Sequence, residues 1–234
     1  MRFGGVIFDM DGTLLDTIED LASCMNRVLE RYGYPAHPVD SYRYFVGEGM
    51  EMLVRRALPD GRDDRETVAR CLADMHKEYG SGWACCSKLY PGIGELLDFL
   101  EDNRIPKAVL SNKPDGFTKD MAEALLGQWT FFEIRGERPP TPRKPDPASA
   151  LEIAAGMGVP PQRVLYLGDS GIDMQTAARA GMYPVGALWG FRSADELKLN
   201  GAKALVKIPG SLYPLYPESH VKSKCKIPGT GKAI

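Results

Sequence analysis

The sequence has little of what membrane, secreted and nucleic-acid-binding proteins are rich in. No apolar run approaches the ~20 residues that a helix needs to span a bilayer. The formal net charge is only -2, so no strong field attracts nucleic acid or an anionic membrane. The chain enters an apolar strand within its first residues, without the hydrophobic segment and cleavage site of a secretory signal. We expect a cytoplasmic protein with neither nucleic-acid nor membrane partners.

Cysteine and histidine are also scarce, and neither forms a recognisable cluster. The five cysteines are an odd number, and none has the spacing of a zinc site or of a redox pair. The three histidines are scattered along the chain. These two residue types therefore give no support to a metal site or a catalytic triad.

What is present is an ordinary globular composition with strands and helices in alternation. The 234 residues, 44% of them hydrophobic, suffice for one large domain or two small ones. Apolar runs predict strands at 6–8, 105–111, 131–134, 163–168, 183–188 and 204–206. Helical periodicity predicts helices at 93–101, 115–126, 146–157, 171–180 and 194–199. This alternation predicts an α/β fold with a doubly wound, Rossmann-like parallel sheet.

Two segments differ from this pattern. Residues 16–86 contain no convincing strand, and helices are predicted at 18–32, 39–46, 50–58 and 65–79. We therefore expect a core of residues 1–15 and 87–210, interrupted by an all-helical cap at 16–86. Residues 211–234 are rich in proline and lysine and are expected to form a flexible tail.

Polar clusters follow the predicted core strands. Asp9 and Asp11 follow the first strand, and two acids this close suit a hard cation such as Mg²⁺ between them. Ser111 and Asn112 end the second strand, where a hydroxyl and backbone amides can hold phosphoryl oxygens. Lys144 lies between an arginine and a proline ahead of a helix. The sequence Gly-Asp-Ser-Gly-Ile-Asp, which contains Asp169 and Asp173, follows the most apolar strand.

These four clusters, in this order, resemble the four motifs of the haloacid dehalogenase superfamily over about residues 3–208. The resemblance implies that Asp9 is a nucleophile that forms an aspartyl-phosphate and that Asp11 is the acid and base. It implies that Ser111 and Lys144 stabilise the phosphoryl group. It further implies that Asp9, Asp169 and the backbone carbonyl of Asp11 bind Mg²⁺, with Asp173 acting at one remove.

The helical insertion after the first motif matches family members with a cap that selects the substrate. The loop Gly47-Glu48-Gly49 resembles the substrate-facing loop of phosphoglycolate phosphatases. Three cap arginines near this loop, Arg43, Arg55 and Arg56, are candidates for binding a second anionic group, although exposed helix charges are the default interpretation.

The prediction is a Mg²⁺-dependent phosphatase that hydrolyses a small phosphorylated metabolite, most similar to phosphoglycolate phosphatase, as a monomer or homodimer. An inorganic pyrophosphatase and a phosphomutase resembling β-phosphoglucomutase share these motifs and remain open. A catalytically silent module that binds a phosphorylated ligand is a further alternative, and the intact set of acids argues against it.

Overall fold

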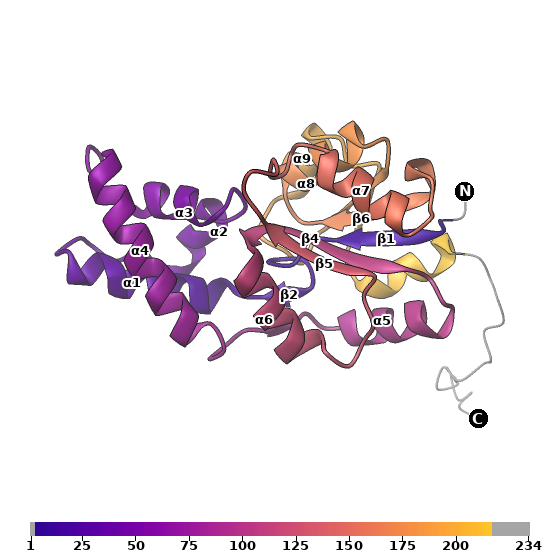
Figure 1. The fold of residues 1–234 in the computed structure, drawn as a ribbon, viewed down its shortest axis with the longest axis horizontal. Coiled ribbons are helices and arrows are strands. Elements are labelled where there is room, and N and C mark those ends of the chain that lie inside the picture. Colours follow the sequence, from indigo (N-terminus) through magenta and orange to yellow (C-terminus); the bar gives the residue numbers. More distant parts are fainter. Residues whose placement is uncertain (1–2, 217–234) are drawn as a thin grey trace, which may run out of the picture.

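The computed structural model describes residues 3–216 as a parallel sheet with helices on both faces and a group of helices beside it (Figure 1). Six strands among these residues form the sheet in the order β5-β4-β1-β6-β7-β8, and neighbouring strands are parallel. They are β1 (Gly5–Phe8), β4 (Lys107–Pro114), β5 (Glu133–Glu137), β6 (Val164–Gly168), β7 (Tyr183–Ala187) and β8 (Ala204–Val206). The predicted doubly wound α/β fold is confirmed.

Alternate side chains of the central strands fill two hydrophobic cores, one on each face of the sheet. In β1, Val6 and Phe8 belong to one core and Ile7 to the other. Successive side chains of a strand point to opposite faces, and both faces here are buried. The central strands therefore read as continuous apolar runs rather than as alternating patterns.

Helices from different parts of the chain cover the two faces. Helices α7 (Ala148–Gly156) and α8 (Gly171–Arg179) pack on the face of Ile7, and α5 (Ile93–Asp102) and α6 (Asp115–Leu126) pack on the other. In Figure 1 the first pair lies above the sheet, with α9 (Ala194–Leu199) beside it, and the second pair lies below.

Residues 16–86 form the group of helices that lies beyond the carboxyl ends of the strands (Figure 1). It contains α1 (Ile18–Arg31), η1 (Val39–Ser41), α2 (Tyr42–Phe45), α3 (Met50–Ala57) and α4 (Arg65–Gly82). The chain enters this group through β2 (Leu15–Asp16) and leaves through β3 (Lys88–Leu89), and these two short strands pair antiparallel. The two connections between the helices and the sheet therefore lie side by side.

Several predicted boundaries differ from the structure for local reasons. The segment 39–46 is a 3-10 turn followed by a single helical turn rather than one helix. Helix α7 starts at Ala148 instead of Asp146, because a residue before proline is disfavoured in the α region and Asp146 precedes Pro147. The Asp146 side chain instead accepts a hydrogen bond from the Ala148 amide at 2.9 Å. The pair β2–β3 is too short to produce a periodic signal and was not predicted.

The prediction of a flexible tail from Ser211 is wrong for its first six residues. Residues Pro209–Leu215 form the 3-10 helix η3, and Leu212 and Tyr216 are buried. Phe99 of α5 lies against Tyr213, with ring centroids 4.6 Å apart. Apolar side chains between the prolines pack on the core, which a compositional argument does not detect. The rest of that prediction, residues 217–234, lies outside the described residues.

No helix among residues 3–216 is both long enough and apolar enough to cross a membrane.

Candidate active site

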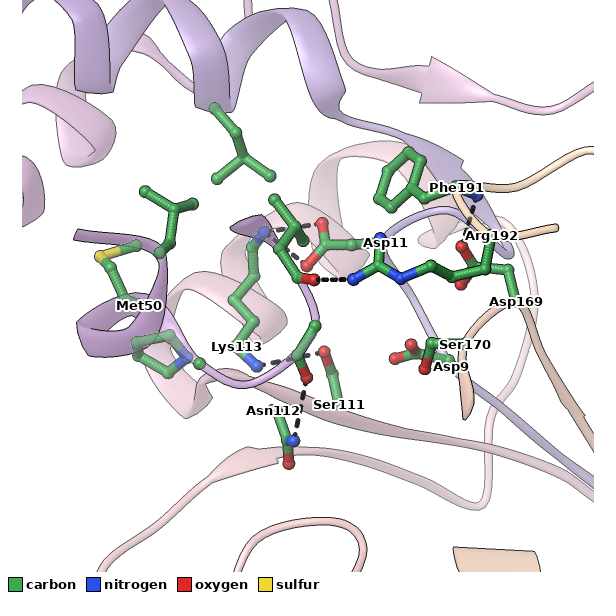
Figure 2. A pocket seen from close by; sticks show the side chains of 16 residues that line it. Asp9, Asp11, Met50, Ser111, Asn112, Lys113, Asp169, Ser170, Phe191 and Arg192 are labelled. Carbon is green, nitrogen blue, oxygen red and sulfur yellow. Dashed lines mark hydrogen bonds and ion pairs between the residues drawn. The ribbon is translucent and has the colours of Figure 1, made fainter. Parts of the chain in front are cut away.

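A pocket opens between the carboxyl ends of the central strands and the helical segment (Figure 2). It encloses about 550 Å³ of space, part of which is open to solvent. Core residues supply most of its polar lining, and the helical segment supplies most of its apolar lining. The residues that line it are Asp9, Asp11, Leu21, Val46, Gly47, Gly49, Met50, Leu53, Ser111, Asn112, Lys113, Pro114, Asp169, Ser170, Phe191 and Arg192.

Three buried carboxylates meet at this edge of the sheet. Asp9 directly follows β1, Asp169 directly follows β6, and Asp173 lies in the first turn of α8. One oxygen from each lies within 4.8 Å of the others. Parallel strands bring their carboxyl ends to one edge, so residues far apart in sequence converge here. Such a set of oxygen donors suits a hard divalent cation.

Lys144 lies at the centre of this cluster. Its Nζ is 2.9 Å from Asp9 Oδ1 and 2.7 Å from Asp173 Oδ1. Asn112 fixes the backbone of this lysine, because its side-chain amide accepts from Lys144 N at 2.9 Å and donates to Lys144 O at 3.0 Å. The second oxygen of Asp173 accepts from Ser170 Oγ at 2.6 Å, within the capping box that starts α8. Asp173 is thus placed to orient Lys144.

The three carboxylates of this cluster have one ammonium group, that of Lys144, among them, and the pKa values of Asp9 and Asp169 reflect this. Burial, reinforced by Asp173, raises the pKa of Asp169 to about 7. Burial and Asp173 also raise the pKa of Asp9 well above its usual range, and Lys144 only partly opposes this. Burial alone would lower the pKa of Lys144, but Asp173 and Asp9 raise it well above its usual value. A bound cation would remove the repulsion among the three acids.

Close packing of two glycines positions Asp169. Its Oδ1 accepts from Thr13 Oγ1 at 3.1 Å, and its Oδ2 accepts from the Phe191 amide at 2.7 Å. A Cβ at Gly12 or Gly190 would lie 2.3 Å or 2.2 Å from atoms of this aspartate. Only glycine therefore fits at these two positions beside the carboxylate.

Asp11 lies apart from the cluster and pairs with a lysine that the sequence analysis did not assign to the site. Lys113 Nζ is 2.7 Å and 2.8 Å from the two carboxylate oxygens, and Thr17 Oγ1 donates to Asp11 Oδ1 at 2.7 Å. The same Nζ lies 4.8 Å from the ring centroid of Tyr79 in α4. Burial would lower the pKa of Lys113, but Asp11 and Tyr79 together raise it above its usual value. This lysine carries its charge and holds Asp11.

Ser111 and Asn112 both line the pocket, although the strand that carries them does not end at Ser111 as predicted. Strand β4 continues through Pro114, with an irregular register against β5 beyond Leu110. The Ser111 hydroxyl accepts from the Lys113 amide at 3.2 Å and lies on the same strand end as Asn112. Its hydroxyl proton stays available for an oxygen of a ligand.

The loop Gly47-Glu48-Gly49 reaches the pocket through its glycines only. Gly47 and Gly49 line it, and Asn112 Nδ2 donates to Gly47 O at 3.1 Å. Glu48 does not line it, because its carboxylate pairs with Arg56 on the helical segment. The prediction that Glu48 contacts the substrate therefore has no geometric support.

The three cap arginines proposed from the sequence are also absent from the pocket lining. Each has partners elsewhere: Arg43 contacts Asp40 and Gly190 O, Arg55 contacts Glu51 and Asp63 O, and Arg56 contacts Glu48 and Phe45 O. The pocket cations are instead Lys113 and Arg192. Lys113 had a signal, since it continues the polar strand-end cluster of Ser111 and Asn112. Arg192 had no such signal in the sequence, because it lies in the loop after β7, which contains none of the four motifs.

Comparison with known proteins defines the class. Residues 6–187 match the family model of the haloacid dehalogenase-like hydrolases, a range that includes all four polar clusters. The chain belongs to the haloacid dehalogenase-like hydrolase family, and the resemblance found in the sequence is confirmed.

Particular relatives narrow the comparison to phosphatases. The chain is 32% identical to a phosphoglycolate phosphatase of Pseudomonas putida over 231 residues, 97% of this chain and 81% of the relative. It is 33% identical to phosphoglycolate phosphatase 1 of Pseudomonas aeruginosa over 192 residues, 80% of this chain and 70% of the relative. A crystal structure from Lactobacillus delbrueckii subsp. bulgaricus, provisionally assigned as a phosphoglycolate phosphatase, superposes with a TM-score of 0.84. It shares 30% identity and covers 91% of this chain and 97% of its own. The prediction of an enzyme similar to these phosphatases is confirmed.

Proposed function

We propose that this protein is a Mg²⁺-dependent phosphatase that hydrolyses phosphoglycolate, or a phosphate monoester very similar to it, through an aspartyl-phosphate on Asp9. The observation that carries the proposal is the buried cluster in which Lys144 Nζ lies 2.9 Å from Asp9, beside Asp169 and Asp173. A second carboxylate, that of Asp11, lines the same pocket. The phosphoglycolate phosphatases among its relatives support this choice of substrate.

The donor set fits the metal ion. Asp9, Asp169 and the backbone carbonyl of Asp11 would hold Mg²⁺, since hard oxygen donors are its preferred ligands. Asp173 acts through Lys144, because one of its oxygens contacts that ammonium and the other accepts from Ser170. When bound, Mg²⁺ supplies positive charge that offsets the repulsion between an anionic ester and an anionic nucleophile.

The side chains divide the reaction between them. An Asp9 carboxylate oxygen attacks phosphorus in line, the bond to the leaving oxygen breaks, and Asp11 gives that oxygen its proton. Asp11, now a carboxylate, takes a proton from water as the water attacks the phosphoryl group on Asp9. That second step releases inorganic phosphate and restores Asp9. Ser111 and Lys144 stabilise the negative charge on the phosphoryl oxygens in both steps.

The helical segment acts as a cap in this proposal. Its apolar residues form one side of the pocket and exclude bulk water from the acyl-phosphate, while the substrate-facing part selects the leaving group. A cytoplasmic location and a monomeric or homodimeric state complete the proposal, and the latter can be measured by light scattering after size-exclusion chromatography.

The test is phosphate release from a panel containing phosphoglycolate, pyrophosphate, β-glucose 1-phosphate and p-nitrophenyl phosphate. We expect the highest kcat/KM for phosphoglycolate and loss of activity in excess EDTA that Mg²⁺ restores. Asp9→Asn should lower turnover by about 10³-fold or more with an unchanged circular dichroism spectrum. The exposed Asp102→Asn is the matched control and should behave as the unchanged protein. Metal-independent release, or full turnover by Asp9→Asn, would contradict the proposal.

A further inference from the structure

The cap side of the pocket offers almost no polar side chain to a substrate. Leu21, Val46, Met50 and Leu53 are its side chains, together with the glycines of the cap loop. The hydroxyl groups of a sugar would find no partners on this wall and would lose hydrogen bonds to water on entry. The part of the substrate beyond the phosphoryl group therefore carries few hydroxyl groups, and its recognition depends on the few polar groups at the pocket edge.

Arg192 is the polar group at that edge with an unused donor. It lies in the loop after β7, and its side chain is 11% exposed. Its Nη2 donates to Val46 O of the cap at 2.8 Å, and its Nε lies 3.3 Å from Glu196 Oε1. Its Nη1 is buried and has no hydrogen-bond partner within residues 3–216. In the view of Figure 2, the Arg192 side chain crosses the middle of the pocket.

The other cation of the lining is already engaged. Lys113 forms an ion pair with both oxygens of Asp11, the residue proposed to transfer the proton. Among the described cations that line this pocket, Arg192 alone presents a donor without a partner. A guanidinium forms strong, directional hydrogen bonds to carboxylates and phosphates, and these hydrogen bonds become stronger where water is excluded.

We propose that Arg192 Nη1 binds the carboxylate of the substrate and that Arg192 is the specificity-determining residue for phosphorylated small carboxylic acids. This inference rests on the proposed phosphatase function and adds the residue that recognises the leaving group of the ester. Because Nη2 bonds to a cap carbonyl, the cap and the core together set the position of Nη1. Recognition of the carboxylate is then coupled to the seating of the cap on the core.

The first experiment compares two esters that differ in this charge. Kinetics are measured with phosphoglycolate and with ethyl phosphate, for the unchanged protein, Arg192→Gln and Arg192→Lys. We expect Arg192→Gln to lower kcat/KM for phosphoglycolate by about 10- to 100-fold, the effect of losing a hydrogen bond to a charged group. Ethyl phosphate should change by less than about threefold. Arg192→Lys should give an intermediate loss, because it keeps the charge without the forked donors.

Arg55→Gln is the matched control. Arg55 is a cap arginine that pairs with Glu51 outside the pocket, so both esters should be hydrolysed as before. Equal loss of both activities in Arg192→Gln would overturn the proposal, since it would show that the arginine only seats the cap. A loss with phosphoglycolate in Arg55→Gln instead of Arg192→Gln would overturn it as well.

A binding measurement separates this inference from the proposed function. Calorimetry with Mg²⁺ present gives the Kd of each ester for Asp9→Asn and for Asp9→Asn combined with Arg192→Gln. We expect Arg192→Gln to weaken phosphoglycolate by about 10- to 100-fold and ethyl phosphate hardly at all. That result supports the inference even if the unchanged protein fails to turn over phosphoglycolate. Such a failure would contradict the proposed function alone, and not the inference. Equal binding in both backgrounds overturns it. So does an Arg192-dependent preference for pyrophosphate over phosphoglycolate, because the anion would then be a phosphate.

Discussion

At the scale of single residues, the two carboxylates of the first motif are close in sequence but contact different side chains. Asp9 faces Lys144 and the acid cluster, whereas Asp11 pairs with Lys113 and Thr17. The first environment places Asp9 beside a cation and two further acids, and the second holds the Asp11 carboxylate at the lining of the same pocket. The two carboxylates therefore have different surroundings, which is compatible with the separate roles proposed for them.

Asp11→Asn should therefore depend on the leaving group. We expect turnover of phosphoglycolate to fall by about 10²- to 10⁴-fold, since an alkoxide needs a proton to leave. Nitrophenolate needs none, so p-nitrophenyl phosphate should still give a rapid burst of about one product per enzyme before slow hydrolysis of the acyl-phosphate. Stopped-flow absorbance measures that burst. Its disappearance together with phosphoglycolate turnover would show that Asp11 acts before the first bond breaks.

At the scale of elements, one loop of the cap and one short helix near the end of the described chain carry consequences that can be measured separately. The cap loop approaches the core at Gly49, where φ is +89° and a Cβ would lie 3.0 Å from Arg143 Nη1. Gly33, after α1, has a similar φ of +71° but open space around it. Both positions disfavour other residues, yet only one lies at the pocket.

Gly49→Ala should lower both stability and catalysis, whereas Gly33→Ala should lower stability alone. Each change costs about 1 kcal/mol because alanine rarely adopts a positive φ. Because Gly49 lines the pocket, the added methyl group and the Arg143 side chain that it displaces should raise KM for phosphoglycolate several-fold. Thermal unfolding and steady-state kinetics on both variants check this. Equal kinetics for the two variants would mean that the exact position of the cap loop does not affect substrate binding.

Helix η3 should contribute to stability without contributing to the chemistry. Leu212 is fully buried, so Leu212→Ala should destabilise the fold by about 2–5 kcal/mol. The exposed neighbour Ser211→Ala is the control and should change stability by less than about 0.5 kcal/mol. Urea unfolding gives both values, and kcat at a temperature where both variants are folded should stay unchanged. A negligible effect of Leu212→Ala would mean that η3 does not pack on the core in solution.

At the scale of the whole molecule, the acid cluster links the proposed metal binding to pH and to stability. Burial, together with Asp173, raises the pKa of Asp169 to about 7 in the folded chain, above the 3.8 of an ordinary aspartate. The folded protein without metal therefore holds this proton more tightly than the unfolded chain does. By linkage, this contribution is fully present below about pH 4 and is lost as the pH rises through 7, because the unfolded chain releases the proton first.

The metal-free protein should accordingly be less stable at pH 8 than at pH 5.5, and Mg²⁺ should reverse the order. Each pH unit within this window is worth up to about 1.4 kcal/mol for one group. Mg²⁺ binding displaces the proton, so its affinity should rise with pH and level off above about 7. Thermal unfolding at both pH values, in EDTA and in Mg²⁺, measures the effect. Asp169→Asn should reduce the pH dependence, and an unchanged dependence would contradict the assignment.

The sequence by itself determined the sheet, the helical insertion and the residues of the acid cluster. Buried strands such as Val164–Gly168 have a continuous apolar pattern, and parallel topology brings the carboxyl end of each to the same edge. Asp9 and Asp169 could be placed together because each directly follows such a strand, and Ser111 was predicted to end one, although β4 continues to Pro114. Local patterns therefore sufficed wherever topology fixed the position of a side chain.

Only the tertiary structure decided which cations and apolar residues serve the pocket and the core. Arg43, Arg55 and Arg56 have the charge to bind a substrate, but neighbouring acids and carbonyls engage them outside the pocket. Arg192 reaches the pocket because the loop after β7 meets the cap at Val46, a contact between residues 146 positions apart. The packing of Leu212 likewise depends on distant partners. Sequence periodicity reports local geometry, and such long-range contacts have no period to detect.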